Sequence, residues 1–265
     1  PSLPKPCAHM AAAKIGDVVY IAGGIENNAL NSAMNNFWAI DMAKSDTADF
    51  KWQVLPSWPG PTRAFNMAAA QYNGNEYCFY VMGGRRQVIG TDPNSVEFLS
   101  DVYEFSPSKY ISNKYDNNDS LSAWRKCASM PETICAASCI DIGQSHIIVF
   151  GGANDKILFL RGDELKNMHP GFRKSSLRYH TITGTWTSAG VFPPGYVTTS
   201  ALKWEGKIVI PSGEIAPRVR SPIIWQAELV QTKSRFGVLN FICLISYLAA
   251  MVIIGIYFAR RNKST

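Results

Sequence analysis

The feature that most constrains this chain is an apolar run that ends in a small residue and a glycine, and that occurs four times. The four runs are Val18–Gly24, Phe79–Gly84, Ile147–Gly152 and Ile208–Gly213. Their final glycines are 60, 68 and 61 residues apart. A near-constant period of this kind is typical of an array of similar structural units. Because glycine adopts positive φ angles freely, each run predicts a strand that turns sharply at its end.

The first three units share one order of elements: a strand, a strand ending at the glycine pair, a loop, an aromatic strand and a last strand with Trp. In the first unit the predicted strands are 8–13, the run ending at Gly24, 37–42 and a strand around Trp52. This order resembles the Kelch repeat. The resemblance implies a β-propeller, in which four-stranded sheets called blades surround a central channel. A β-sandwich with chance Gly-Gly turns is the alternative.

The fourth unit has strands at 197–204, 207–211 and 222–230, but no fourth strand with a Trp. We therefore predict an all-β, Kelch-type propeller with about four blades of a six-bladed ring, the last blade being incomplete. The simplest completion is that the missing strand and further blades precede residue 1.

Two segments between the predicted strands are long. Residues 106–122 are polar and rich in turn residues, which predicts a surface loop. Residues 153–176 are different, because they carry several large apolar side chains. We expect this second segment to fold over part of the domain. The apolar residues concerned are Phe159, Leu160, Met168 and Phe172.

Residues 236–258 are 23 uncharged residues, long enough to span a bilayer as a helix. Basic residues flank both ends, three after the run and two before it, which weakly favours a cytoplasmic C-terminus. The predicted domains are thus the propeller at 1–232 and a membrane helix with its basic flank at 233–265. A simple tail anchor is the alternative interpretation of this helix.

Composition excludes several function classes. The net charge of +6 is spread along the chain, without the basic and aromatic interleaving of a nucleic-acid surface, so nucleic acid is not a predicted partner. The six cysteines show no C-x-x-C or zinc spacing, and we expect them to be small buried residues. No Walker loop or Ser-His-Asp signal occurs, and no metal or cofactor is predicted. The histidines are scattered, so structural roles are the default for His9, His146, His169 and His180.

The fourth unit carries the most specific motif. Ser212-Gly-Glu-Ile-Ala-Pro-Arg-Val-Arg220 resembles the Gly-Glu-x-x-Pro-Gly-x-Arg stretch of the Kelch-type N-acetylneuraminate (sialic acid) mutarotases. The 61–63 and 151–154 segments are similar to that family as well, over residues 1–230 in all. One departure is Arg218, which stands where the family motif usually has Gly.

The incomplete last unit matches the cyclically permuted branch of that family. Residues 247–261 resemble the first transmembrane helix of sodium:solute symporters, and mutarotase-like domains fused ahead of such symporters occur in bacteria. The resemblance therefore implies a bacterial inner-membrane protein, with the propeller on the periplasmic (extracytoplasmic) side and a symporter domain in the same full-length chain.

Loops after second strands and loops before first strands emerge on the same face of a propeller, so their polar residues are predicted to ring the channel mouth. These residues are Glu26, Arg63, Arg85, Asn154 and Glu214. For Glu26 or Arg85 a solvated loop charge is the alternative, and for Asn154 a turn-capping role.

The resemblance assigns the roles. Glu214 is the expected catalytic base, and Arg220 the clamp for the sugar's carboxylate. Arg63, Asn154 and Arg85 are further expected substrate-binding residues. Two functions follow: a mutarotase that interconverts the anomers of sialic acid for an attached transporter, or a non-catalytic module that binds the sugar and presents it. Both take a small-molecule sugar as ligand and no cofactor.

Overall fold

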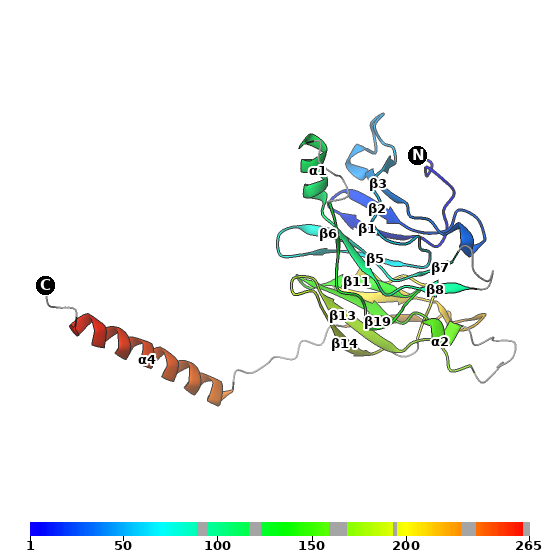
Figure 1. The fold of residues 1–265 in the computed structure, drawn as a ribbon. Helices are drawn as coiled ribbons and strands as arrows, with labels where there is room; N and C mark the ends of the chain where they lie inside the picture. Colours follow the sequence, from blue (N-terminus) through cyan, green and yellow to red (C-terminus); the bar gives the residue numbers. More distant parts are fainter. Residues whose placement is uncertain (89–94, 117–122, 159–168, 193–194, 229–236, 262–265) are drawn as a thin grey trace. The chain divides into compact units, whose positions relative to one another are not determined.

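The computed structural model describes residues 1–88, 95–116, 123–158, 169–192, 195–228 and 237–261. The chain divides into two compact units, Pro1–Ala227 and Glu228–Thr265. The first unit is a β-structure, and the second contains the C-terminal helix (Figure 1).

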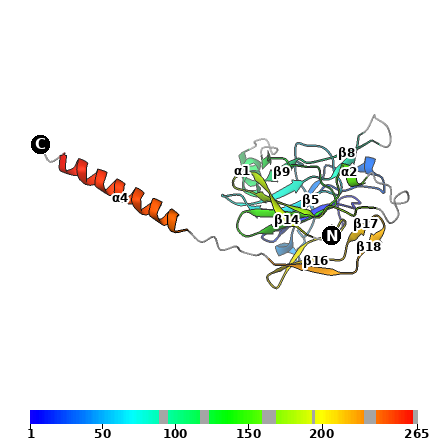
Figure 2. The ribbon, with the colours of Figure 1, turned by 90° about the horizontal axis from the view of Figure 1, so that it is seen from below.

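The strands of the first unit form a series of antiparallel blades (Figures 1 and 2). Blade 1 is β1 (Ala11–Ile15), β2 (Val18–Ala22), β3 (Phe37–Asp41) and β4 (Gln53–Val54). Blade 2 is β5 (Met67–Tyr72), β6 (Tyr77–Met82), β9 (Val102–Phe105) and β10 (Trp124–Lys126). Blade 3 is β11 (Ser138–Ile142), β12 (His146–Phe150), β13 (Ser175–His180) and β14 (Thr185–Val191). Blade 4 is β15 (Leu202–Trp204), β16 (Lys207–Pro211) and β19 (Ile224–Ala227).

This arrangement confirms the predicted β-propeller of four blades with an incomplete last blade. In each blade the strands pair in the predicted order, and the β13–β14 hairpin places Tyr179 opposite Trp186. The first strands of neighbouring blades lie side by side, β1 beside β5 and β5 beside β11. A six-bladed ring stays a prediction.

The hydrophobic core lies between successive blades. Between blades 1 and 2, Tyr20 and Phe37 pack against Phe79, Phe105 and Trp124, with ring centroids 4.8–5.9 Å apart. Similar apolar clusters join blade 2 to blade 3 and blade 3 to blade 4. The predicted aromatic strands thus supply the large side chains that fill the space between sheets.

The glycine that ends each second strand is required by the next blade. A Cβ atom on Gly83 would lie 2.3 Å from the Ile134 carbonyl oxygen, and one on Gly151 would lie 2.4 Å from that of Tyr196. Both glycines also have positive φ, 58° and 62°. The repeated glycine therefore marks where two blades touch backbone to backbone. In blade 4 the equivalent residue is Ser212, with a φ of 55°.

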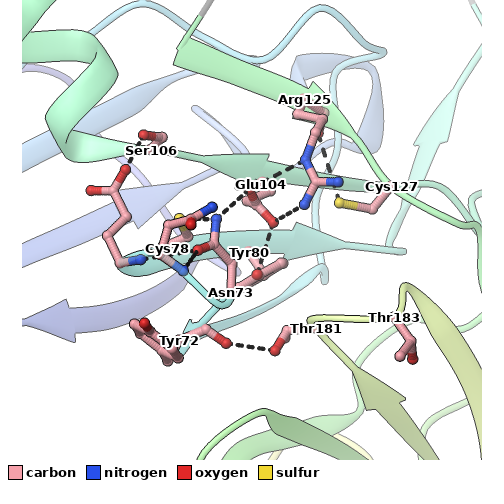
Figure 3. A network of polar contacts seen from close by, with 12 residues as sticks. Tyr72, Asn73, Cys78, Tyr80, Glu104, Ser106, Arg125, Cys127, Thr181 and Thr183 are labelled. Atoms are coloured by element: carbon pink, nitrogen blue, oxygen red, sulfur yellow. Dashed lines mark hydrogen bonds and ion pairs between the residues drawn. The ribbon is translucent and has the colours of Figure 1, made fainter. Parts of the chain in front are cut away.

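A buried carboxylate ties the strands of blade 2 together (Figure 3). Glu104, only 4% exposed, accepts hydrogen bonds from the Asn73 amide at 3.0 Å and the Tyr80 hydroxyl at 2.8 Å. The Arg125 guanidinium completes the cluster with an ion pair. Burial, with the neighbouring Glu104 charge, raises the pKa of Tyr80. We call Glu104, Asn73, Tyr80 and Arg125 the Glu104 cluster.

The two long segments differ from each other. The predicted surface loop at 106–122 contains a helix, α1 (Pro107–Asp116), so the prediction of a plain loop was wrong there. In the second segment α2 (Asp155–Leu158) is a single helical turn. Phe172 is buried against Cys135, Ala153 and Val197, as expected for a segment that folds over the domain. Phe159, Leu160 and Met168 lie outside the described residues.

The second unit contains α4 (Val238–Arg261), 24 residues long and exposed along its length. Within the described residues, α4 is the one helix long and apolar enough to cross a membrane. This agrees with the predicted span at 236–258 in length and composition. The domain boundary at 232 falls outside the described residues, and the limits 1–232 and 233–265 stay predictions.

Candidate functional site

The chain enters the first strand of every blade through a residue with positive φ. These residues are His9, Phe65, Ala136 and Thr198, with φ of 53–56°. Backbone hydrogen bonds join them in order: the Phe65 N–H donates to the His9 carbonyl, that of Ala136 to Phe65, and that of Thr198 to Ala136, over 2.7–3.1 Å. We call these four residues the belt. It fixes the spacing of the blades around the channel.

A pocket of about 590 Å³ opens inside the belt. All four belt residues line it, together with Arg220 and the starts of the first strands. Small side chains such as Ala11, Ala68 and Ala137 on its walls leave the space open. The predicted channel mouth is therefore a pocket with both polar and aromatic walls.

The residue after each glycine pair reaches the same level as the belt. Single β-bridges join Ala8 to Ile25, Ala64 to Arg85, Cys135 to Ala153 and Val197 to Glu214. In every pair the first residue directly precedes a belt residue. Each blade thus brings two side chains to this level, one from the belt and one that follows the glycine pair.

Glu214 and Arg220 face each other on a short ribbon. Glu214 begins β17 (Glu214–Ala216), and Arg220 ends β18 (Val219–Arg220). The register makes the two residues direct cross-strand partners, whose Cβ atoms lie about 5 Å apart in antiparallel pairs. Glu214 is half-buried, whereas Arg220 is exposed on the pocket wall. The six-residue spacing seen in the sequence thus places the two residues opposite each other on one short ribbon.

The turn between β17 and β18 explains the role of residue 218. Arg218 has a φ of 63°, in the region that glycine favours, and its backbone N–H donates to Oε1 of Glu214 at 2.6 Å. The turn therefore orients the Glu214 carboxylate. An arginine at this position adopts a conformation that costs most L-residues about 1–2 kcal/mol.

Arg85, Phe65 and His9 form a stack at the mouth. The His9 imidazole lies on the Phe65 ring with centroids 4.1 Å apart and 21° between the planes. The Arg85 guanidinium carbon lies 4.5 Å from the centroid of the same ring. Partial burial, and secondarily the charge of Arg85, lowers the pKa of His9 below its usual 6.5. At neutral pH this imidazole is therefore mostly uncharged.

Sequence reasoning gave His9 a structural role, and the structure instead leaves its ring exposed on the pocket wall. A signal was present in the repeat. His9-Met-Ala-Ala and Phe65-Asn-Met-Ala both stand just before a first strand, at the same place in neighbouring units. The other histidines keep local contacts: His180 with Ser145 and Thr183, and His146 with His180.

Arg63 lies beneath the mouth and has no exposed surface. Its guanidinium donates to the Gly83 carbonyl at 3.0 Å and to Asp101 at 2.8 Å, and it lies near the rings of Trp58 and Tyr103. The expectation that Arg63 contacts substrate is therefore corrected. The side chain ties the connection that enters blade 2 to the end of β6 and to the residue before β9, and we give it no part in the proposed substrate site.

Asn154 and Glu26 each lie one residue beyond the bridge positions. Asn154 is half-buried, and its amide lies 3.5 Å from Glu132, a carboxylate that also pairs with Arg173. Glu26 is exposed and pairs with Lys5 at 3.5 Å. Neither residue lines the 590 Å³ pocket. Of the expected site residues, Arg220 lines the pocket itself. Glu214 lies opposite Arg220 on the same ribbon, and Arg85 contacts the lining residue Phe65, so these two lie beside the pocket.

No metal centre is evident in the described residues, where no three His, Cys, Asp or Glu side chains gather to hold an ion. The cysteines of the propeller are free thiols. Burial raises the pKa of Cys135 to about 11. Such thiols are poor nucleophiles at neutral pH.

No known family model matches the chain. It is similar to N-acetylneuraminate epimerases. That of Pasteurella multocida (strain Pm70) is 25% identical over 244 residues, which cover 84% of this chain and 57% of the relative. Those of Yersinia enterocolitica and Brucella melitensis are 21% and 25% identical, covering 89% and 88% of this chain and 59% of each relative. The chain thus spans less than two thirds of these proteins.

Among solved structures, that of YjhT superposes on this chain with a TM-score of 0.63. The match covers 89% of this chain and 68% of the other, at 19% identity. The likeness shows the fold. Together with the strand order, it identifies the first unit as a four-blade propeller arrangement.

Proposed function

We propose that this chain carries the active site of a sugar mutarotase, which interconverts the anomers of N-acetylneuraminate or a closely related acid sugar. The observation that carries the proposal is the cross-strand pair of Glu214 and Arg220, with Arg220 on the pocket wall. The relatives named N-acetylneuraminate epimerase support the same chemistry at low identity.

In this mechanism Glu214 is the base. It takes the proton of the anomeric hydroxyl, and the electron pair of that O–H bond forms the carbonyl at the anomeric carbon. The bond from this carbon to the ring oxygen breaks, and the ring oxygen takes up a proton from water. Rotation of the opened chain presents the other face of the carbonyl. The reverse steps then close the ring as the other anomer.

Arg220 is the clamp. A sialic acid carries a carboxylate on its anomeric carbon, and the planar guanidinium accepts that group with two parallel hydrogen bonds. Because Glu214 and Arg220 are direct partners on one ribbon, a carboxylate held by Arg220 brings the anomeric hydroxyl close to Glu214. Arg85 supplies a second positive charge at the mouth.

The test follows the α/β equilibration of freshly dissolved N-acetylneuraminate by NMR. The full chain is expected to accelerate it, and Glu214→Gln is expected to lose at least about 100-fold of that acceleration. Binding should survive in Glu214→Gln, because the amide preserves the shape of the side chain. If the wild-type chain leaves the rate at that of buffer while still binding the sugar, the non-catalytic binding module replaces the enzyme.

The membrane setting belongs to the same proposal. We place α4 across a bacterial inner membrane as the first helix of an attached sodium:solute symporter, with the propeller on the periplasmic side. The length and apolar character of α4 support a membrane span. A cysteine introduced at Lys109, an exposed position on α1, should react with an impermeant maleimide added outside the cytoplasm. Labelling only after the cytoplasm is opened would reverse the orientation.

A further inference from the structure

At the belt, the four blades share one backbone conformation but carry different pairs of side chains. Each pair combines a belt residue with the residue after the glycine pair of the same blade. From blade 1 to blade 4 the pairs are His9 with Ile25, Phe65 with Arg85, Ala136 with Ala153, and Thr198 with Glu214. Blade 3 contributes only methyl groups. The polar and aromatic groups are therefore concentrated on blades 1 and 2 and on blade 4.

The aromatic residues of the belt are not explained by the backbone. All four belt positions have φ of 53–56°, which asparagine or glycine would adopt at lower cost than phenylalanine. The folded scaffold tolerates Ala136 at the same φ, so a ring is not needed for the turn itself. Strained backbone that carries large side chains at a pocket is commonly retained for function.

The stack is also placed to meet a ligand. His9 is exposed and Phe65 half-buried, and both line the pocket that Arg220 lines. Along the belt, Phe65 is two blades and His9 three blades from Thr198. The stack and the Glu214–Arg220 ribbon therefore belong to well-separated blades around one pocket.

Resting on the proposed function, we propose that the Arg85–Phe65–His9 stack is a second recognition element, which holds the part of an acid sugar that lies farthest from its carboxylate. Arg220 fixes the carboxylate on blade 4, and the exposed imidazole of His9, with the edge of the Phe65 ring that supports it, takes the carbon-rich end on blades 1 and 2. A ligand that uses both elements must extend beyond a six-carbon ring. The stack thus selects long, substituted acid sugars over short ones.

The charge state of the stack fits this role. Burial and the Arg85 charge lower the pKa of His9, so a neutral imidazole faces the ligand near pH 7. A neutral ring offers an apolar face and both a donor and an acceptor nitrogen for sugar hydroxyls. Arg85, held on Phe65, adds a guanidinium at the edge of the stack.

The experiment compares two ligands by saturation-transfer NMR titration of the full chain in detergent micelles. N-acetylneuraminate is the long acid sugar, and glucuronate is the short one. The variants are Phe65→Asn and His9→Asn, because asparagine accepts positive φ well and removes the ring without disturbing the belt. Each variant is expected to weaken N-acetylneuraminate binding about 3- to 10-fold, the scale of an aromatic contact, and to change glucuronate binding less than twofold.

Controls separate a local effect from misfolding. Phe65→Tyr keeps a ring and should retain wild-type binding, and Trp204→Ala, which removes an exposed ring that does not line the pocket, should leave both ligands within twofold. Unchanged affinity for N-acetylneuraminate in both Asn variants would overturn the proposal. So would an equal loss for the two sugars, or no measurable binding by the wild type. A wild type that binds without accelerating anomer exchange refutes the proposed catalysis alone, because the affinities are read independently of turnover.

Discussion

Two carboxylates in this propeller have opposite surroundings. Glu104 is 4% exposed, and its oxygens accept from Asn73, Tyr80 and the Arg125 guanidinium. Glu214 is half-buried at the mouth, and in the described part of the chain the donor to its side chain is the backbone N–H of Arg218. A carboxylate whose lone pairs are all engaged is held in place, whereas one with unused lone pairs is available to a ligand. A buried carboxylate with several hydrogen-bond donors thus indicates a structural role. A partly exposed carboxylate with few donors indicates a candidate functional site.

The arginines repeat this contrast. Arg63 is fully buried between the Gly83 carbonyl and Asp101, and Arg173 is similarly held by Gly151 and Glu132. Both donate to the carbonyl of the glycine that ends the second strand of a blade, so they hold that strand end in place. Arg220 is exposed on the pocket wall instead. The same residue type therefore serves as a strut in one region and as a candidate ligand clamp in the other.

The strongest test of the contrast removes the buried carboxylate. Glu104→Ala leaves the Asn73 amide and the Tyr80 hydroxyl without their acceptor, which should lower the free energy of unfolding by about 2–4 kcal/mol. Urea denaturation of the full chain in detergent measures it. Glu26→Ala, which breaks an exposed pair with Lys5, is the control and should cost less than about 1 kcal/mol. Equal losses in the two variants would contradict the division between the regions.

Arg220→Ala tests the exposed arginine on the pocket wall. It should weaken the binding of N-acetylneuraminate by about 1.5–3 kcal/mol, the scale of a charged hydrogen bond, and leave a neutral sugar such as N-acetylmannosamine almost unaffected. Isothermal titration calorimetry at matched protein concentration measures both. Arg218→Gly removes a guanidinium from the same ribbon and should leave acid-sugar binding nearly intact. An equal loss for neutral and acid sugars in Arg220→Ala would make the residue structural.

Arg218→Gly is also informative for stability. Glycine adopts the observed φ of 63° without the strain that arginine bears, but it loses more chain entropy on folding. The balance should stabilise the propeller by roughly 0.5–1 kcal/mol. The backbone N–H that contacts Glu214 is retained, so catalysis should not change. Thermal unfolding checks the sign, and a lower melting temperature would show that the Arg218 side chain stabilises the turn.

The fold was largely predictable because its strongest signal is local. The glycine pairs mark where each second strand meets the next blade, and the aromatic strands follow at regular distances. Helix α1 was missed because its sequence is polar, although it carries a helix start. Ser106 accepts the N–H of Lys109, and Pro107 occupies the first helical position. Its Tyr110 packs on Phe105, a contact that no local pattern announces.

Only those site residues that are close together in the sequence could be predicted to lie together in the structure. Glu214 and Arg220 are six residues apart, so a tight ribbon brings them together. The burial of Arg63 depends on Asp101, 38 residues along the chain, and no spacing rule links them. The exposure of His9 depends likewise on Phe65 in the next blade. Contacts between residues far apart in the sequence therefore decide which polar side chains reach the pocket. These contacts cannot be inferred from the spacing of residues in the sequence.

The smallest expected effect is a change in the pKa of His9 when the neighbouring positive charge of Arg85 is removed. Because Arg85 contributes to the lowered pKa of His9, Arg85→Met should raise that pKa toward its usual value, with burial still holding it down. A group whose pKa is lowered by folding binds protons more readily in the unfolded chain, so its contribution to stability is lost as pH falls below about 6.5. Arg85→Met should reduce that loss.

An NMR titration of the imidazole carbon-bound protons of His9 measures the shift directly. Arg86→Met is the matched control, because Arg86 is the next residue and its guanidinium is already paired with Glu97 at 2.6 Å. The His9 pKa should rise in Arg85→Met and stay in place in Arg86→Met. A rise of the same size in both variants would mean that His9 responds to the general field of the mouth. A rise in Arg85→Met alone shows that the Phe65 stack holds one particular charge beside the imidazole.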